Sequence, residues 1–458
     1  MDDTIKVGQY IIVQRQNFTK LHKFSALDST VTLGKEMVEL KNIAGQNFFQ
    51  TFKMKLIASG KKRLHELEIC DNATNLKDIL TSIESGSDNR NILDDGKSQS
   101  LSYEEIINMR QTLSDSKEII GTIIANSNSF NQKTEFSQEK YIKKKEKKYF
   151  EFIQVRKPTL RLLTEIFYRQ DPEKALGLRM DSLSQLISYS GVNSMGNYLI
   201  YESGSSGLVP AAFLNSMGDH GDARLVHLHP GNFPQMQAVY ALNLTDHHLK
   251  RCSSVNIYSV LRQYYQGIEE NVETLSQTES ENEKMDIDES SRKRKLENDD
   301  TEDDNKPPKR QNFEEDENNE QQNEVPISDE NSSNTLTDRE EKKRKWQLDN
   351  DEAIRLFKEK FDSLTIVAKE DPFPIVKELL PFIHNGRPVV IFHACKEVLM
   401  ECYTSLKNHN LLINVRLFSN FMRDYQVLPM RTHPAIQLQG NSGWLLVGYT
   451  VNHGITLN

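Results

Sequence analysis

The sequence predicts an α/β protein with a separate β domain near its N-terminus. Short runs of strand type, separated by polar or glycine-containing turns, fill residues 1–70. From Phe152 onward, segments of helix and strand type alternate, which is typical of parallel α/β units. The same alternation resumes after a long acidic stretch, so we interpret that stretch as an insertion within one sheet domain. A chain of 458 residues is long enough for two or three domains, each with its own core.

The strand-type runs of residues 1–87 predict a small β-barrel. In T-F-K-M-K-L, Phe52 and Met54 alternate with Lys53 and Lys55, which is the period of a half-buried strand. Several short strands within one block favour a barrel-like sheet.

Residues 88–150 predict a helical, basic connector. The stretch L-S-Y-E-E-I-I-N-M-R predicts a helix, because Ser102 can cap its first turn and Glu105, three residues later, can complete a capping box. Helical periodicity then continues through the rest of the segment. A run of lysines lies between Tyr141 and Tyr149.

The α/β domain is predicted in two parts, 151–267 and 351–458. Residues 268–350 separate them and contain E-N-D-D-T-E-D-D-N and E-E-D-E-N-N-E, with no apolar periodicity. This composition predicts a disordered acidic insertion. The insertion carries many of the acids behind the formal net charge of −9, so the rest of the chain is less acidic than the total suggests.

The composition favours a soluble, intracellular protein. Its four cysteines are scattered without a C-x-x-C pair, which suggests neither a disulfide framework nor a zinc site and indicates a reducing compartment. The first residues lack the order of a secretory signal, and no apolar run approaches the roughly 20 residues that span a bilayer. We therefore expect no membrane partner.

Four stretches of the sequence are distinctive: D-N-R-N-I-L-D-D-G-K-S-Q (88–99), K-T-E-F-S-Q-E-K-Y-I-K-K-K-E-K-K-Y (133–149), K-P-T-L-R (157–161) and R-D-Y-Q-V-L-P-M-R-T-H-P (423–434). They resemble one known family, the non-catalytic subunit of the eukaryotic tRNA (adenine(58)-N(1))-methyltransferase. The resemblance covers nearly the whole chain outside the insertion. It implies a small N-terminal β-barrel, a Rossmann-like methyltransferase domain, and a two-plus-two heterotetramer with a catalytic sister subunit of the same fold. It also implies that this subunit binds tRNA while the sister subunit binds S-adenosylmethionine.

A glycine-rich stretch, Y-E-S-G-S-S-G-L, has the order of a cofactor-binding turn between a strand and a helix. Active methyltransferases of this fold place E/D-x-G-x-G-x-G there. Glu202 and Gly204 match this frame, but Ser206 and Leu208 occupy the next two glycine positions. We expect the Leu208 side chain to intrude on a ligand, although Gly207 could offset this by shifting the turn.

Two further positions lack the acids that methylation needs. The second strand, R-L-V-H-L-H, ends in His229, where a carboxylate would accept both ribose hydroxyls. In F-D-S-L-T-I-V-A-K-E-D-P, Asp362 matches the first acid of the D-x-V-x-x-D-x-P pattern, and Val367 stands in place of the catalytic acid. We therefore expect a catalytically silent subunit that binds no cofactor. The alternative, a self-sufficient S-adenosylmethionine-dependent RNA methyltransferase, lacks both acids.

The candidate RNA-binding residues are basic and lie in three places. The lysine run is by composition more often a solvated helix face than a phosphate contact, but the resemblance favours tRNA. Candidates in the second place could instead serve structure, since Pro158 indicates a helix start. Those in the third flank Pro429 and could order the domain or a subunit interface. The candidates are Lys140, Lys143, Lys144, Lys145, Lys147 and Lys148, then Arg156, Lys157 and Arg161, and finally Arg423 and Arg431.

Other motifs have plainer interpretations. His227 and His229 alternate along one strand, but with no third ligand nearby a metal site is not favoured. Cys395 and Cys402 are expected on one helix face in the core. Two basic clusters in the insertion, S-R-K-R-K (291–295) and P-P-K-R (307–310), resemble a bipartite import signal and predict a nuclear protein. A nuclear RNA-binding factor that acts without a partner would leave the sheet domain unexplained.

Overall fold

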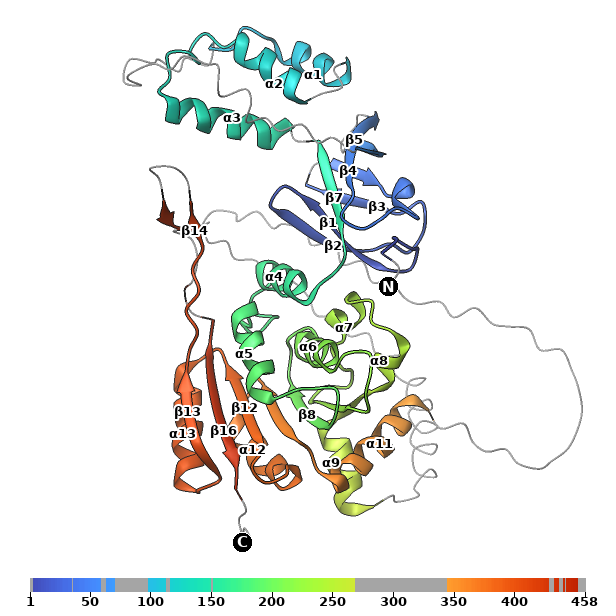
Figure 1. The fold of residues 1–458 in the computed structure, drawn as a ribbon, viewed down its shortest axis with the longest axis vertical. Coiled ribbons are helices and arrows are strands. Elements are labelled where there is room, and N and C mark those ends of the chain that lie inside the picture. The colour runs from blue at the N-terminus through green and yellow to red at the C-terminus, as the bar shows by residue number, and fades with distance from the viewer. Residues whose placement is uncertain are drawn as a thin grey trace, which may run out of the picture. The chain divides into compact units, whose positions relative to one another are not determined.

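The computed structural model describes residues 3–34, 36–58, 63–70, 98–112, 116–149, 151–267, 344–427, 432–435, 440 and 442–451. Their strands form two seven-stranded sheets and one two-stranded sheet (Figure 1). The two basic clusters and most of the predicted insertion lie outside these residues. No helix among the described residues is long and apolar enough to cross a membrane.

The first sheet is barrel-like and belongs mainly to the N-terminal part of the chain. Its strand order is β2-β1-β7-β5-β6-β4-β3, and neighbours are antiparallel except for β4 and β6. In β5, Phe52 and Met54 are buried and Lys55 is exposed, as the alternation predicts. The strands are β1 (Tyr10–Arg15), β2 (Phe18–Lys23), β3 (Thr30–Leu33), β4 (Glu36–Glu39), β5 (Thr51–Ala58), β6 (Arg63–Ile69) and β7 (Phe152–Arg156), with a 3-10 turn at Lys41–Ile43.

Strand β7 shows that the first sheet does not end where the sequence suggests. The expected boundary at residue 151 assigns this strand to the α/β domain, but β7 lies between β1 and β5. Val155 pairs with Val13, and Ile153 pairs with Phe52. Ile153 and Val155 are buried in the core of the first sheet. A five-residue strand cannot indicate its partners, because they lie far away in the sequence.

A helical segment separates β6 from β7. It contains α1 (Tyr103–Thr112), α2 (Ser116–Ala125) and α3 (Glu135–Tyr149), and it has a small core that includes Ile120 and Phe130. The predicted capping box is confirmed. The Ser102 amide donates to Glu105 Oε2 at 2.8 Å, and the Glu105 amide donates to Ser102 Oγ at 3.2 Å.

The second sheet has the order β10-β9-β8-β11-β12-β16-β13. Strands β10, β9, β8, β11 and β12 are parallel, and β16 is antiparallel to both of its neighbours. Strand β16, the last strand in the chain, is therefore interior, and β13 forms one edge of the sheet. The strands are β8 (Asn197–Glu202), β9 (Arg224–His229), β10 (Cys252–Asn256), β11 (Ser363–Val367), β12 (Pro388–His393), β13 (Leu412–Phe418) and β16 (Trp444–Thr450).

Helices cover both faces of the second sheet, because its strands are apolar on both sides. In β8, Tyr198 and Ile200 belong to one core cluster, whereas Leu199 and Tyr201 belong to the other. The first cluster includes α4 (Leu160–Gln170), α5 (Met180–Ser190), α6 (Leu208–Met217) and α7 (Gln237–Ala241). The second includes α9 (Ile257–Gln266), α11 (Lys345–Glu359), α12 (Pro372–Leu379), the 3-10 turn Leu380–Phe382 and α13 (Lys396–Asn408). Helix α8 (Asp246–Lys250) precedes β10, and β14 (Tyr425–Gln426) pairs with β15 (His433–Pro434).

Helix α11 begins at Lys345, inside the range expected to be a disordered insertion. Its buried residues include Asn350, Ala353 and Phe357, which lie on one helix face. Asn350 Nδ2 donates to Ser259 Oγ at 3.0 Å. Helix α11 therefore starts six residues before the predicted boundary at residue 351.

Candidate functional site

A glycine-rich turn connects β8 to α6 at the carboxyl end of the second sheet, next to the point where the strand order reverses. Glu202 ends β8, and its Oε1 accepts hydrogen bonds from the amides of Ser205 at 2.8 Å and Gly207 at 3.1 Å. The Ser203 amide donates to the Val367 carbonyl at the end of β11, at 3.1 Å. Amides at such a turn are the groups that would otherwise bind a ligand. Here these three amides donate within the chain.

Gln235, in the loop after β9, closes the turn from the other side. Its Oε1 accepts a hydrogen bond from the Ser206 amide at 2.9 Å. The Ser206 carbonyl accepts one from the Ala238 amide at 3.0 Å. A Cβ atom on Gly207 would lie 2.6 Å from the Gln235 carbonyl oxygen, so the loop backbone lies directly against the turn. A further turn amide is thus bound by the chain's own side chain.

Leu208 does not provide the obstruction expected from the sequence. It is the first residue of α6, it is fully buried, and it belongs to the core cluster that contains Phe213. Gly204 is not obstructed either, because a Cβ atom there would lie 3.7 Å from Lys369 Cε, an ordinary van der Waals distance. The closure comes from Gln235, which no motif indicates because it lies 29 residues after Ser206.

Beneath the turn, Glu202 and His227 form a buried pair without a hydrogen bond. Their facing atoms, Oε2 and Nε2, are 4.0 Å apart, and neither has a hydrogen-bond partner among the described residues. Burial raises the pKa of Glu202 to about 7 despite its bonds to the turn amides. Burial, with nearby His229, lowers the pKa of His227 to about 3. The imidazole is therefore neutral, and the carboxyl group titrates near neutral pH.

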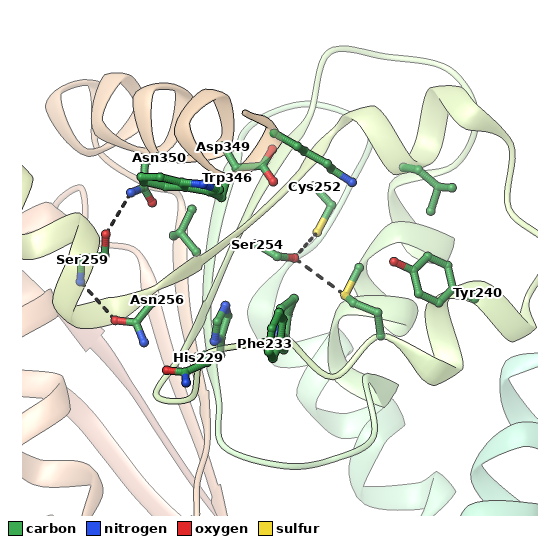
Figure 2. Close-up of a pocket in the computed structure, with 16 residues that line it drawn as sticks. His229, Phe233, Tyr240, Cys252, Ser254, Asn256, Ser259, Trp346, Asp349 and Asn350 are labelled. Carbon is green, nitrogen blue, oxygen red and sulfur yellow. Dashed lines mark hydrogen bonds between the residues drawn. The ribbon is translucent and has the colours of Figure 1, made fainter. Parts of the chain in front are cut away.

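Strands β9 and β11 end in side chains that cannot replace the missing acids. His229 Nδ1 donates to the Gly231 carbonyl at 2.8 Å, and burial lowers its pKa. Val367 is fully buried and pairs in register with Glu202 and Phe392. A neutral imidazole and an apolar side chain thus occupy the two positions. His229 also lines a cavity of about 520 Å³ (Figure 2).

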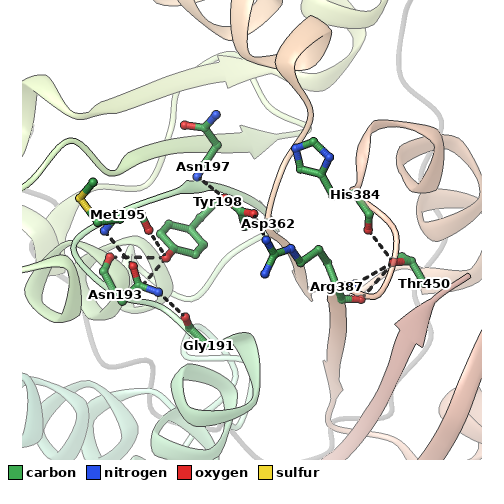
Figure 3. Close-up of polar contacts among 9 residues, drawn as sticks. All are labelled: Gly191, Asn193, Met195, Asn197, Tyr198, Asp362, His384, Arg387 and Thr450. Atoms are coloured by element: carbon green, nitrogen blue, oxygen red, sulfur yellow. Dashed lines mark hydrogen bonds and ion pairs between the residues drawn. The ribbon is translucent and has the colours of Figure 1, made fainter.

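Asp362, the retained acid of the second motif, has a structural role at the opposite end of the sheet. Its Oδ2 accepts a hydrogen bond from the Asn197 amide at 3.0 Å, and its Oδ1 pairs with Arg387 Nη2 at 3.0 Å (Figure 3). A Cβ atom on Gly196 would lie 2.6 Å from Oδ2. Asp362 therefore ties together the amino ends of β8, β11 and β12, far from the glycine-rich turn in the strand direction.

Helix α3 presents the predicted lysine run. Lys140, Lys143 and Lys144 are exposed, while the other side of the helix contributes to the small helical core. Lys145 Nζ lies 5.0 Å from the centre of the Tyr141 ring, a cation–π contact. The side chains of Lys147 and Lys148 lie outside the described part of the structure.

The exposed face of α3 lies beside the β14–β15 hairpin. Lys140 and Lys143 line a cavity of about 440 Å³ together with Phe136 and His433. Lys143 also pairs with Glu139 Oε1 at 2.8 Å, so part of its charge is balanced locally. The structure thus places Lys140 and Lys143 next to the hairpin, and the candidate Arg423 also contacts this region of the chain.

The three basic candidates around β7 each contact a side chain of the same chain. Arg156 Nη1 donates to Gln14 Oε1 at 2.9 Å within the first sheet. Lys157 pairs with Asp3 at 3.2 Å and precedes α4, so it does not share a helix face with Arg161. Arg161 is on α4, is 74% exposed and pairs with Glu165 at 2.9 Å. Helix α4 is capped by Thr159, whose side chain accepts from Leu162 N.

The remaining candidates separate in the structure. Arg423 Nε donates to the Ala435 carbonyl at 3.4 Å beside the hairpin, and Arg431 lies outside the described residues.

The two cysteines expected on one helix face do not share the core. Cys402 is buried in α13, but Cys395 is exposed at the helix N-cap, with Sγ donating to Glu397 at 2.9 Å. Among the described residues, no cluster of histidine, cysteine and acidic side chains could hold a metal ion.

Comparison with known proteins assigns the chain to a family. The family model described as Gcd10p matches residues 4–289. The chain is 31% identical to a protein of Mus musculus over 98% of this chain and 89% of that protein. The chain belongs to the Gcd10p family. The Mus musculus relative is named the tRNA (adenine(58)-N(1))-methyltransferase non-catalytic subunit TRM6.

A second relative, from Dictyostelium discoideum, carries the same subunit name and is 30% identical over 98% of this chain and 80% of its own length. Solved structures that the chain is similar to include an S-adenosylmethionine-dependent O-methyltransferase from Thermotoga maritima, with 9% identity, 99% and 97% of the two chains covered, and a TM-score of 0.46. The tRNA (m1A58) methyltransferase TrmI from Aquifex aeolicus is 10% identical, with 98% and 100% covered and a TM-score of 0.37. Likenesses this low carry no functional argument.

Proposed function

We propose that this chain is the non-catalytic, tRNA-binding subunit of a tRNA (adenine(58)-N(1))-methyltransferase complex, in which a catalytic sister subunit methylates N1 of the adenine. Its relatives carry the name of that subunit. The observation that carries the proposal is the closure of the glycine-rich turn, whose amides donate to Glu202, Val367 and Gln235. A chain closed in this way binds no S-adenosylmethionine and needs a partner that does.

The lysine run of α3 is the proposed tRNA contact. Lys140, Lys143 and Lys144 are exposed on one helix, and exposed lysines bind phosphate as mobile point charges without reading sequence. Their position beside the β14–β15 hairpin supports a shared surface. Such a surface would grip the tRNA backbone while the sister subunit presents the adenine to its cofactor.

The finer architecture is part of the same proposal. We propose a small barrel, a helical connector and a Rossmann-like methyltransferase domain interrupted by the acidic insertion. Two such chains would alternate with two sister subunits in a two-plus-two heterotetramer, because related folds offer pseudo-symmetric surfaces that close a ring. The basic clusters at 291–295 and 307–310 would direct the chain to the nucleus.

A reconstitution experiment tests the proposal. The chain is purified alone, the methyltransferase that co-purifies with it from its own cells is identified and expressed separately, and methylation of a tRNA transcript is measured for each chain and for the mixture. We expect activity only in the mixture, and calorimetric titration of this chain alone with S-adenosylmethionine should give no binding. A dissociation constant in the low micromolar range, or methylation by this chain alone, would instead support a self-sufficient enzyme.

A further inference from the structure

The cavity beside the ends of β9 and β10 is not used by the turn or by the lysine run. It has a volume of about 520 Å³, within the usual range of small-molecule sites. Three aromatic side chains from three different segments stand at its rim (Figure 2). Phe233 is 87% exposed, Trp346 56% and Tyr240 52%. Aromatic rings at this exposure keep apolar surface in contact with water, and exposed apolar surface around a cavity often marks a binding site.

The wall of the cavity is held by amide side chains. Asn256 Nδ2 donates to the Gly231 carbonyl at 2.9 Å, and its Oδ1 accepts from the Ser259 amide at 3.1 Å. Asn350, almost fully buried, donates to Ser259 Oγ at 3.0 Å. These bonds fix the loop after β9, the start of α9 and the start of α11 relative to one another. The cavity is therefore built by hydrogen bonds and not by a chance gap between side chains.

The chemistry of the lining indicates what the cavity can hold. Asp349 places a carboxylate in the wall, so a phosphate would be repelled there, while N–H donors would be accepted. Met236 and Cys252 add an apolar, polarizable floor. Lys345 lies one helical turn before Asp349 and supplies the only positive charge among the lining residues. A flat, partly polar ring with N–H groups fits these features, and its phosphate would lie near Lys345.

We propose that this cavity binds a purine base, stacked on the rim aromatics with its N–H groups directed to Asp349. Aromatic faces stack on any base, and a two-ring base offers the larger face. An unstacked base of an RNA and a free purine nucleotide share this chemistry. The RNA source rests on the proposed tRNA-binding function, whereas the free nucleotide does not.

The two tryptophans of the chain make the test direct. Trp444→Phe leaves Trp346 as the only tryptophan, so its fluorescence reports on the rim. The single-tryptophan chain is titrated with GMP and with AMP, and ribose 5-phosphate serves as the base-free probe. We expect saturable quenching by the purine nucleotides, checked by equilibrium dialysis, and none by ribose 5-phosphate. Linear quenching without saturation would overturn the proposal.

Variants identify the side chains involved. In the single-tryptophan chain, Phe233→Ala and Asp349→Asn should each weaken purine binding about tenfold, because each variant removes one stacking or hydrogen-bonding partner of the base. The control Phe421→Ala removes another highly exposed ring, 71% exposed, that is not among the lining residues, and should leave binding unchanged. Equal weakening in Phe421→Ala, or unchanged binding in Phe233→Ala, would contradict the assignment.

Competitors separate the sources of the base and the alternatives. Displacement of AMP by an unmodified tRNA transcript supports an RNA base, and binding of AMP without displacement by tRNA supports a free nucleotide. Tight binding of S-adenosylmethionine alone would overturn both this proposal and the silent-subunit function. Binding of N-acetylarginine amide in place of nucleotides would reassign the cavity to a protein side chain. Because the nucleotide titration uses no tRNA, it can fail while tRNA binding by α3 still holds.

Discussion

The glycine-rich turn and helix α3 use their polar groups in opposite ways. In the turn, backbone amides point to acceptors of the same chain, and Glu202 beneath them is buried. On α3, Lys140 and Lys144 extend into solvent from a helix whose other side is packed. Buried donors that are already satisfied have nothing to gain from a ligand, whereas exposed charges can exchange counterions for phosphate. The comparison shows that the turn satisfies its amides within the chain, whereas α3 leaves its lysines in contact with water.

The largest expected effect is on the closed turn. Gly207→Ala would place a methyl group 2.6 Å from the Gln235 carbonyl oxygen, at a φ of +78°. We expect the free energy of unfolding to fall by about 2–4 kcal/mol, since backbone strain and overlap add. The matched control is Gly191→Ala, at a φ of +65° with no heavy atom within 4 Å, which should cost about 1 kcal/mol. Urea unfolding measures both, and equal destabilisation would show that the loop does not press on the turn.

The second effect concerns the buried carboxyl group. Because the pKa of Glu202 is raised to about 7, the protonated form stabilises the fold below about pH 4.5, and this stabilisation is lost as the pH rises through 7. His227, whose pKa is lowered to about 3, acts in the opposite sense. The stability from its neutral form is present above pH 6.5 and is lost as the pH falls towards 3.

Glu202→Gln isolates the carboxyl contribution. Relative to the unchanged chain, this variant should be more stable at pH 8 by up to about 3 kcal/mol and about equal in stability at pH 4.5. Glu165→Gln, on the exposed surface of α4, serves as the control and should show no such trend. Unfolding curves between pH 4.5 and 8 give the answer, and a pH-independent difference would mean that Glu202 is ionised throughout.

The third effect tests the open surface. Replacing Lys143, Lys144 and Lys145 with alanine should weaken tRNA binding about tenfold. The negative slope of log affinity against log salt should become less steep, by roughly 0.7–0.9 for each phosphate that the variant no longer neutralises. Stability should change little. A control that removes three exposed lysines of the second sheet domain, Lys250, Lys358 and Lys377, should leave the slope intact. Filter binding at several salt concentrations measures the slope. An unchanged slope in the α3 variant would mean that these lysines form a solvated helix face and do not contact tRNA phosphates.

The smallest effect is expected at Arg161. Its guanidinium is exposed and already paired with Glu165 at 2.9 Å, and such pairs contribute about 0–1 kcal/mol. Arg161→Ala should therefore change stability by less than about 0.5 kcal/mol and tRNA affinity by less than twofold. Lys144→Ala is the comparison on α3. A larger drop in tRNA affinity at Arg161 than at Lys144 would move the tRNA surface from α3 towards α4.

Local patterns in the sequence were sufficient for features that depend on neighbours in the chain. The capping box of Ser102 and Glu105, the alternation in β5 and the strand end at His229 all follow from residues a few positions apart. The missing acids at His229 and Val367 were likewise visible, because a strand end and its last side chain are local. These features describe which elements form and which side chains end the strands.

Only the tertiary structure decided which distant segments meet. Strand β7 pairs in the first sheet, Gln235 closes the turn that contains Ser206, and the cavity joins Phe233 to Trp346 across the long acidic segment. Periodicity and capping record the conformation of neighbouring residues, whereas such contacts depend on how whole elements pack. The sequence by itself therefore determined that no acid stands at positions 229 and 367, and the fold decided that Gln235, from another loop, accepts a hydrogen bond from a turn amide.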